Sequence, residues 1–332
     1  MESTLSSNRK VSLYIWVAVA ALLTLVPQVA VAQQARRPYR VGVLNEAQAA
    51  NHPTVEGLGS GLRELGLEEG RDVTFDIRFT QGKPGAMPVA AAALVKASVD
   101  LIFTIGEAST HAAKSATQKI PIVFTEVGDP VAMGIVTKFA QPGGNLTGIS
   151  SLTLELVPKR LEALKTLAPS LRRVWVIYDL HDETAIVAIA RAQQAAPRLK
   201  LELVPRAVDS TPQLRQTLHE LRRGDGLLAP DIDTLEIPAG ILEASLASRI
   251  PAVFPADLWL SQGGLLSYGP EYHAQGVQAA RLVARILRGA RPQDLPVEGA
   301  DKIDLTVNLK TAKSLGLTVP RKILVRADKV IR

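Results

Sequence analysis

Hydrophobic and polar positions along the first half of the chain follow two patterns, one typical of buried strands and one of amphipathic helices. Apolar runs without polar alternation predict strands covered on both faces of a sheet, at 39–44, 100–105 and 121–125. Strict alternation over 73–79 predicts a half-exposed strand near a sheet edge. Apolar residues at spacings of three and four predict a helix that ends at Gly66, and further helices are expected at 87–98 and from Gly106 onwards.

The second half repeats this alternation of strands and helices. Strands are expected at 173–178, 200–204, 226–229, 251–254, 265–268 and 302–309. Helices are expected around 157–168 and at 183–196, 211–223, 234–249, 272–288 and 311–315. Because strands and helices alternate throughout, we expect an α/β fold built on parallel, doubly wound sheets.

The segment 121–150 divides the two halves. A strand at its start is followed by a turn at 128–130, a short helix and the Gly-rich sequence 141–145, after which 146–150 is extended again. We interpret this segment as the place where a first lobe ends and the chain crosses into a second. Another Gly-rich stretch at 263–269 joins similar elements, so we expect two α/β lobes with a cleft between them.

The N-terminus has the pattern of a secretory signal peptide over residues 1–32. Arg9 and Lys10 precede an apolar run of 16 residues at 11–26, and an Ala-x-Ala motif at 30–32 marks the cleavage point. A membrane anchor is the alternative, but this run is shorter than the ~20 residues that span a bilayer. We therefore expect cleavage, export to a bacterial periplasm and no membrane insertion of the mature protein. The chain has no cysteine, so neither a lipid anchor nor disulfides are expected.

The charge balance is mildly basic, with 38 Lys and Arg against 32 Asp and Glu. These basic residues are scattered singly and in pairs, and aromatic residues make up only 4% of the chain. A nucleic-acid-binding protein would more often gather its basic residues on one face. Composition therefore favours an ordinary soluble protein and argues against nucleic acid as a partner.

Sequence motifs of catalysis are missing. The chain contains neither a G-x-x-x-x-G-K-[ST] phosphate loop nor a G-x-S-x-G nucleophile motif. Gly57-x-Gly59-x-Gly61 lacks the dinucleotide-binding spacing and lies in a predicted helix, so close helix packing is the better interpretation. The segment His181-Asp182-Glu183 is more typical of a polar turn than of a metal site. We therefore predict a protein without catalytic residues, metal or cofactor. An enzyme using Asp129, Asp231 or Asp257 as a base would need a partner group that the sequence does not indicate.

The candidate ligand-binding residues are polar or aromatic side chains at the carboxyl ends of predicted strands, where open α/β sheets bind ligands. They are Asn45, Glu46, Gly106, Glu107, Ser109, Thr110, Asp129 and Ser150 in the first half, and Tyr178, Asp179, Asp231, Asp257 and Trp259 in the second. N–H groups and hydroxyls after Gly106 suit a carboxylate, although Ser109 and Thr110 are equally typical of plain N-caps. The acids suit an ammonium group, and Tyr178 or Trp259 suits an apolar side chain. Taken singly, each acid is more typical of a helix cap or turn.

A set of short motifs in a fixed order resembles a known family. The motifs are IPIVF followed by GDPV, then QPGGNLTGIS, GGLLSYGP, DLPVE and NLKTAKSLGL. They resemble the ABC transporter substrate-binding proteins of the tryptophan-binding, TrpX-like type, and the likeness runs from about Arg40 to Ile331. The resemblance implies a type I periplasmic-binding fold, in which two lobes joined by a three-strand hinge close around a ligand. It also implies a monomer that delivers a small-molecule ligand to an ABC permease in the inner membrane.

The same resemblance implies the division into lobes and the kind of ligand. The first lobe would comprise 38–146 and 270–297, and the second 147–269 and 298–332. The ligand would be an amino acid or an aromatic or carboxylic acid, captured for import. The alternative is an exported sensor that presents its closed form to a membrane receptor. Many relatives have a T-P-A type loop where this chain has the acidic Glu107.

Overall fold

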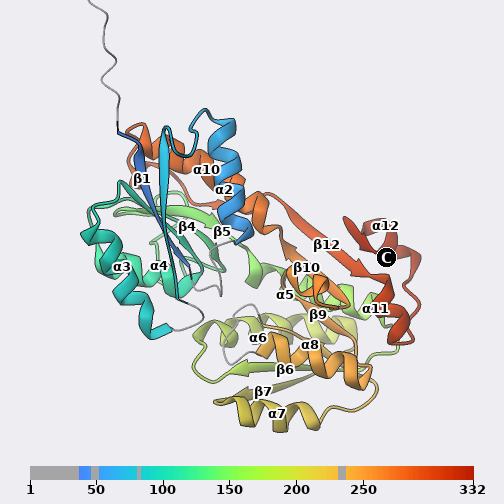
Figure 1. Cartoon of the computed structure of the whole chain (residues 1–332). Coiled ribbons are helices and arrows are strands. Elements are labelled where there is room, and N and C mark those ends of the chain that lie inside the picture. The colour runs from blue at the N-terminus through green and yellow to red at the C-terminus, as the bar shows by residue number, and fades with distance from the viewer. Residues whose placement is uncertain (1–36, 46–51, 81–83, 231–236) are drawn as a thin grey trace, which may run out of the picture. The chain divides into compact units, whose positions relative to one another are not determined.

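The computed structural model describes residues 37–45, 52–80, 84–230 and 237–332 (Figure 1). The chain divides into two units, Met1–Arg37 and Pro38–Arg332, and all elements below belong to the second. The predicted signal peptide lies outside the described residues. Within the described residues, no helix combines the length and apolar character needed to cross a bilayer.

The first sheet has six parallel strands in the order β11-β5-β4-β3-β1-β2. Its strands are β1 (Tyr39–Asn45), β2 (Val73–Phe79), β3 (Leu101–Ile105), β4 (Ile122–Val127), β5 (Leu146–Ser150) and β11 (Glu298–Gly299). The alternating strand β2 lies at the edge of the sheet, as its pattern predicted.

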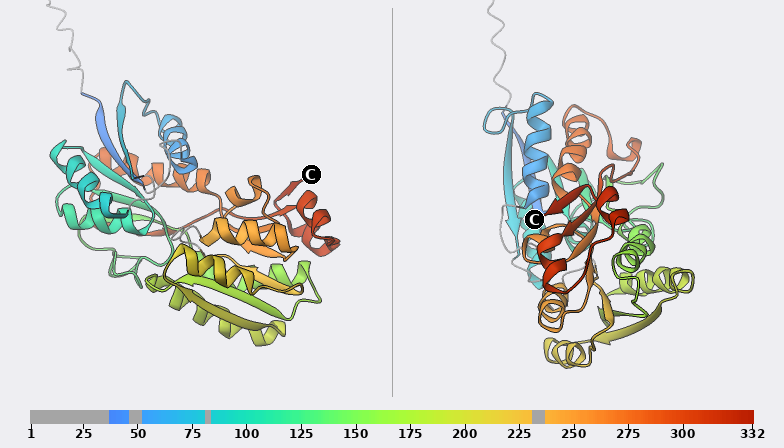
Figure 2. Two further views of the ribbon diagram at one scale, coloured as in Figure 1. Left: turned by 60° about the horizontal axis from the view of Figure 1, so that its bottom comes forward. Right: turned by 90° about the vertical axis from the view of Figure 1, so that its right-hand side faces the viewer.

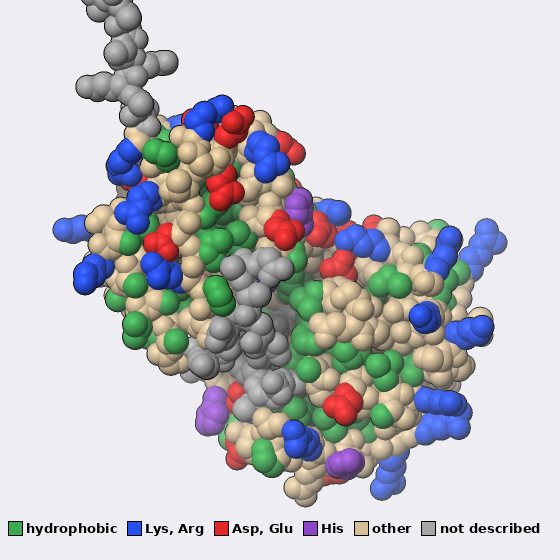
Figure 3. Space-filling model, viewed as in Figure 1, with side chains coloured by type: hydrophobic (Ala, Val, Ile, Leu, Met, Phe, Trp, Pro, Cys, Tyr) green, Lys and Arg blue, Asp and Glu red, His purple; other side chains and the backbone are tan. Residues whose placement is uncertain are grey.

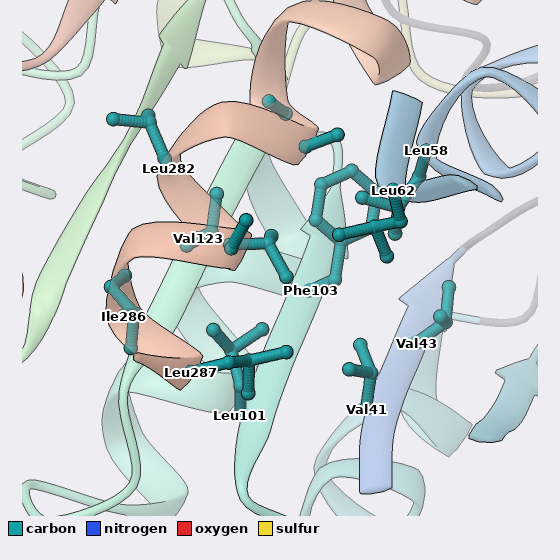
Figure 4. Packing of buried hydrophobic residues seen from close by; sticks show 14 of the residues in the cluster. Val41, Val43, Leu58, Leu62, Leu101, Phe103, Val123, Leu282, Ile286 and Leu287 are labelled. Carbon is teal, nitrogen blue, oxygen red and sulfur yellow. The ribbon is translucent and has the colours of Figure 1, made fainter. Parts of the chain in front are cut away.

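Helices cover both faces of the first sheet, which confirms the apolar runs as doubly buried strands. One face carries α2 (Pro53–Glu64) and α10 (Tyr272–Leu287), and the other carries α3 (Met87–Lys96) and α4 (Glu107–Ala116). Figure 4 shows strand residues such as Val41 and Phe103 packed against side chains of α2 and α10.

The second sheet has seven strands in the order β13-β12-β10-β9-β8-β6-β7. They are β6 (Arg173–Asp179), β7 (Glu202–Val208), β8 (Asp225–Leu228), β9 (Ala252–Phe254), β10 (Leu266–Pro270), β12 (Ile303–Asn308) and β13 (Lys329–Ile331). One face packs on α5 (Thr153–Leu167), α6 (Glu183–Ala195), α11 (Leu309–Ser314) and α12 (Arg321–Arg326). The other packs on α7 (Thr211–His219), α8 (Ile237–Ser248) and α9 (Leu258–Ser261) (Figure 2). Short 3-10 segments occupy Pro84–Ala86, Ala196–Leu199 and Pro292–Asp294.

The chain passes between the two sheets three times, from β5 to α5, from β10 to α10 and from β11 to β12. These passages confirm the α/β fold with two lobes that the sequence predicted. Sheet pairing includes 146–150 and 298–299 in the first sheet, whereas the boundaries drawn from the sequence ended the first lobe at 146 and 297. The lobe boundaries themselves stay a prediction.

The second sheet departs from the all-parallel prediction at one pair, because β10 and β12 are antiparallel. The three passages explain this difference. Strand β10 leaves the second sheet for the first, and β12 returns from the first sheet, so the two strands run in opposite directions.

Some sequence-based elements are wrong in detail. The short helix expected after Pro130 is a run of turns, because the N–H groups of Ile135 and Val136 bond back to the Pro130 carbonyl and Gly134 has a φ of 63°. Strand β7 begins two residues later than expected, and α7 ends at His219. The sequence patterns did not indicate α9, α12, β11 or β13, all of which are short.

Glycines set the distance between α2 and α10, which confirms that Gly57 and Gly61 serve close packing. A Cβ at Gly57 would lie 2.0 Å from the His273 carbonyl oxygen, and one at Gly61 would lie 2.7 Å from the Ala280 Cβ. From the α10 side, a Cβ at Gly276 would lie 2.1 Å from the Thr54 carbonyl oxygen. The two backbones therefore touch, which fixes the start of α2 against the start of α10.

Candidate functional site

The topology brings the carboxyl ends of both sets of strands to the side where the chain crosses between sheets. In the first sheet, β5 and β11 leave at their carboxyl ends, and β1, β3 and β4 run parallel to them. In the second sheet, β10 leaves at its carboxyl end, and β6, β8 and β9 run parallel to it. Ligands of open α/β sheets bind at such ends, so the predicted residues are located relative to them.

In the first sheet, Glu107 and Ser150 meet at the peptide of Gly128, just beyond β4. The Gly128 N–H donates to Glu107 Oε1 at 3.3 Å, and the Ser150 hydroxyl donates to the Gly128 carbonyl at 2.9 Å. A Cβ at Gly128 would lie 2.9 Å from the Thr153 hydroxyl, so this position requires a small residue. The ends of β4 and β5 and the starts of α4 and α5 therefore form one polar site.

The hydroxyls of Ser109 and Thr110 are used inside the fold. Ser109 donates to the Ile105 carbonyl at 2.7 Å, and Thr110 donates to the Gly106 carbonyl at 2.7 Å. Both side chains are fully buried, and neither accepts an N-capping bond. Gly106 occupies the cap position with a φ of 90°, which glycine tolerates. These residues hold the turn from β3 into α4.

The remaining first-lobe candidates lie around this site. Asn45 is buried at the end of β1. Asp129 accepts the N–H groups of Val131 and Ala132 and so caps the turn after β4. Glu46 and Asp231 lie outside the described residues.

In the second sheet, Tyr178 lines a pocket at the ends of β6 and β8. Its cavity is small, about 30 Å³, and its wall is mostly aliphatic, from α5, α6 and the two strand ends. Arg160 lies at its base, only 1% exposed, and donates from Nε to the Tyr268 carbonyl at 2.8 Å. Asp182 at the wall caps α6 through Thr184, and burial raises the pKa of its carboxyl although the bonds to Thr184 oppose that shift. Asp179 accepts the His181 N–H at 2.8 Å.

Asp257 and Trp259 are not among the residues that line this pocket. The Asp257 carboxylate is paired with Lys329 at 2.8 Å. The Trp259 ring stacks on Phe254 at a centroid distance of 6.0 Å inside the hydrophobic core and is 9% exposed. The structure therefore does not bring these two side chains together with Tyr178.

The sequence patterns missed a polar cluster at the end of β4, formed by His52, Thr54, Glu126 and Gln275. The Thr54 hydroxyl donates to Glu126 Oε1, and His52 Nδ1 lies 3.7 Å from the same oxygen. The Gln275 side-chain oxygen accepts the Glu126 N–H at 3.3 Å. Burial raises the pKa of the Glu126 carboxyl, an effect partly offset by His52 and by the bond from Thr54. Glu126 comes directly after the strand predicted at 121–125, and this position is a local sign of a strand-end residue. Its partners lie at α2 and α10, which are distant in the sequence, so no local pattern indicated them.

We expect the isosteric change Glu126→Gln to make the folded protein at least as stable as the wild type at pH 7. The unfolded chain loses this proton near pH 4.3, whereas the folded chain keeps it to a higher pH, so wild-type stability falls as the pH rises between these two values. Glutamine has no such titration. Urea denaturation of both proteins from pH 4 to pH 8 measures the difference. The free energy of unfolding of the variant should increase relative to that of the wild type as the pH rises. A relative decrease with rising pH would contradict the raised pKa of Glu126.

Basic side chains are spread over the face shown in Figure 3 and not gathered in one patch, which agrees with their scattered positions in the sequence. Among the described residues, no group of three or more His, Cys, Asp or Glu side chains could hold a metal ion.

Two α/β lobes linked by three passages, with polar residues at the strand ends, are the fold of periplasmic binding proteins. The family model described as ABC transporter substrate binding protein matches residues 42–331. The chain therefore belongs to the ABC transporter substrate-binding protein family.

Individual relatives agree with this assignment. A tyrosine-binding protein of Clostridioides difficile is 27% identical over 277 residues, covering 82% of this chain and 80% of the relative. A conserved domain protein from Vibrio cholerae superposes with a TM-score of 0.81 at 30% identity, covering 89% of this chain and all of that one. A Streptococcus pneumoniae domain in complex with L-Trp superposes with a TM-score of 0.80 at 24% identity, over 89% of this chain and all of its own, and shows the same fold.

Proposed function

We propose that this protein is a periplasmic solute-binding protein that captures an amino acid, or a related aromatic or carboxylic acid, between its lobes for an ABC importer. The match of the substrate-binding family model over 42–331 carries this proposal. The names of the relatives support the ligand class, since one is a tyrosine-binding protein and another was solved with L-Trp.

Two parts of the structure support this ligand class, one polar and one apolar. The polar site at Gly128 and the start of α4 offers hydrogen-bonding groups for a charged head group. The mostly aliphatic wall beside Tyr178 offers apolar contacts to a ligand side chain that lies against it. Hinge motion at the three passages between the sheets would bring these two half-sites onto one ligand.

The proposal extends to location and partners. The predicted signal peptide at 1–32 would export the chain, and the mature protein would work as a monomer without membrane insertion. The closed form would then dock on an inner-membrane ABC permease and release the ligand there. In this role the protein performs no chemical reaction on its ligand.

Thermal denaturation of the purified protein against amino acids, aromatic acids and short carboxylates tests this function. A ligand that binds only the folded state stabilises it by about 2.7 kcal/mol at a hundredfold excess over Kd. We expect one compound class to raise Tm in a saturable way while remaining chemically unchanged. Absence of any shift across the panel would contradict the proposed ligand class, and turnover of a compound would contradict a pure binding role.

A further inference from the structure

The polar cluster of His52, Thr54, Glu126 and Gln275 lies where a ligand at the ends of β1, β3 and β4 would reach it. Glu126 is separated from Gly128 by one residue, and it adopts a left-handed φ of 57° at an irregularity in the pairing of β4 with β5. Such a conformation is strained for a side chain of this size, and strained positions concentrate at ligand-binding sites. The bond from the Thr54 hydroxyl shows that the side chain extends toward the start of α2, and the backbone N–H of Glu126 donates to the Gln275 side-chain oxygen at the start of α10.

Within the described part of the chain, this cluster is only half satisfied. Oε1 of Glu126 accepts the Thr54 hydroxyl, whereas Oε2 has no partner among the described residues. The side-chain nitrogen of Gln275 is enclosed without a hydrogen-bond partner, although the residue is only 1% exposed. An enclosed donor without a partner is costly, and in native structures an ordered water, an ion or a ligand commonly completes the hydrogen bonds of such a group.

The charge of the cluster is also unbalanced. Among the described residues, the nearest group that can carry a positive charge is His52, and no Lys or Arg forms an ion pair with Glu126. The Glu126 side chain is 13% exposed, so water compensates its charge poorly. Asp257 differs in this respect, because Lys329 already neutralises it.

We propose that Glu126 is the ammonium-binding residue of the ligand site, and that the Gln275 side-chain nitrogen donates to an oxygen of the same ligand. This assignment rests on the proposed solute-binding function and narrows its ligand class. The ligand carries a primary ammonium group next to an acceptor oxygen, as the head group of an α-amino acid does. Thr54 and His52 are positioning residues that hold one carboxylate oxygen and leave the other for the ligand.

Calorimetric titration with L-tyrosine, L-tryptophan and the analogue of tyrosine that lacks the amino group, 3-(4-hydroxyphenyl)propionate, tests the proposal. We expect the wild type to bind one of the two amino acids and Glu126→Gln to weaken that binding about 10- to 100-fold, the loss typical of a hydrogen bond to a charged group. The variant should bind the analogue as the wild type does. Glu56→Gln, an exposed carboxyl on the same helix as Thr54, is the matched control and should leave all affinities unchanged.

The possible outcomes distinguish a failure of the role assigned to Glu126 from a failure of the proposed solute-binding function. Equal amino-acid affinity of the wild type and Glu126→Gln overturns the role of Glu126 and leaves solute binding intact. Wild-type protein that binds the analogue as tightly as tyrosine overturns the ammonium requirement without needing any variant. Binding of neither amino acid by the wild type removes the amino-acid ligand from the proposed function, and the role of Glu126 is overturned with it.

Discussion

Replacing Gly276 by alanine is expected to lower the free energy of unfolding by about 3 kcal/mol, at the upper end for an overpacked site. The new Cβ would lie 2.1 Å from the Thr54 carbonyl oxygen and 2.7 Å from the Leu58 nitrogen, both backbone atoms of α2. Because backbone atoms cannot move aside as a flexible side chain can, α2 and α10 would have to separate. That separation would open the packing between the two helices and the strands beneath them.

The matched control is Gly59→Ala on α2. A Cβ at Gly59 meets no atom within 4 Å, so this change should stabilise the helix by about 0.5–1 kcal/mol. Urea midpoints of both variants measure the contrast. If Gly276→Ala were as stable as the wild type, the close approach of the two helices would be wrong.

The second large effect is expected from Lys329→Met. Lys329 lies 2.8 Å from Asp257 and 3.1 Å from Asp304, whose side chain is only 6% exposed. Burial alone would lower the pKa of Lys329, but its hydrogen bonds to the two aspartates outweigh this and raise the pKa above its ordinary value. Among the described residues, methionine would leave Asp304 with Lys302, at 3.9 Å, as its remaining ion-pair partner. We expect a loss of about 2 kcal/mol, below the value for a fully buried pair because Lys329 is 41% exposed.

A second substitution separates lost charge compensation from lost packing. In the Lys329→Met background, Asp304→Asn removes the stranded charge and should restore a large part of the stability. The exposed Lys322→Met, on α12, should change the free energy of unfolding by less than about 0.5 kcal/mol. Additive losses in the double variant would show that Lys329 does not act through Asp304.

The fold followed from hydrophobic periodicity because each of its main elements buries a continuous apolar face. In β3 every residue is buried, and in α2 the spacing correctly indicated Val55, Leu58 and Leu62, whereas Leu65 at the helix end is exposed. Prediction failed where tertiary contacts decide local structure. The turns after Pro130 are set by bonds over five and six residues, and β13 exists through its pairing with β12.

The candidate site could be predicted only in outline. Strand-end position singled out Glu107 and Ser150, which the structure brings together at Gly128, and their role in ligand binding stays a prediction. The same rule selected Asp257 and Trp259. The sequence does not show that Lys329 pairs with Asp257 or that Phe254 stacks on Trp259. Gln275 lies 149 positions from Glu126, so their hydrogen bond has no local sequence pattern.

The late position of helix α10 in the sequence determines when the two hydrophobic cores can form during synthesis of the chain. It contributes Ala279, Leu282 and Val283 to the core of the first lobe, yet it is made after most of the second lobe. The second lobe in turn receives β12 and β13 only after α10. Neither core can therefore close while the chain is still emerging from the ribosome, because contacts between distant segments wait for the last of them. A polypeptide that stays incompletely packed until its final residues are made would suit the proposed export through a secretion channel in the unfolded state.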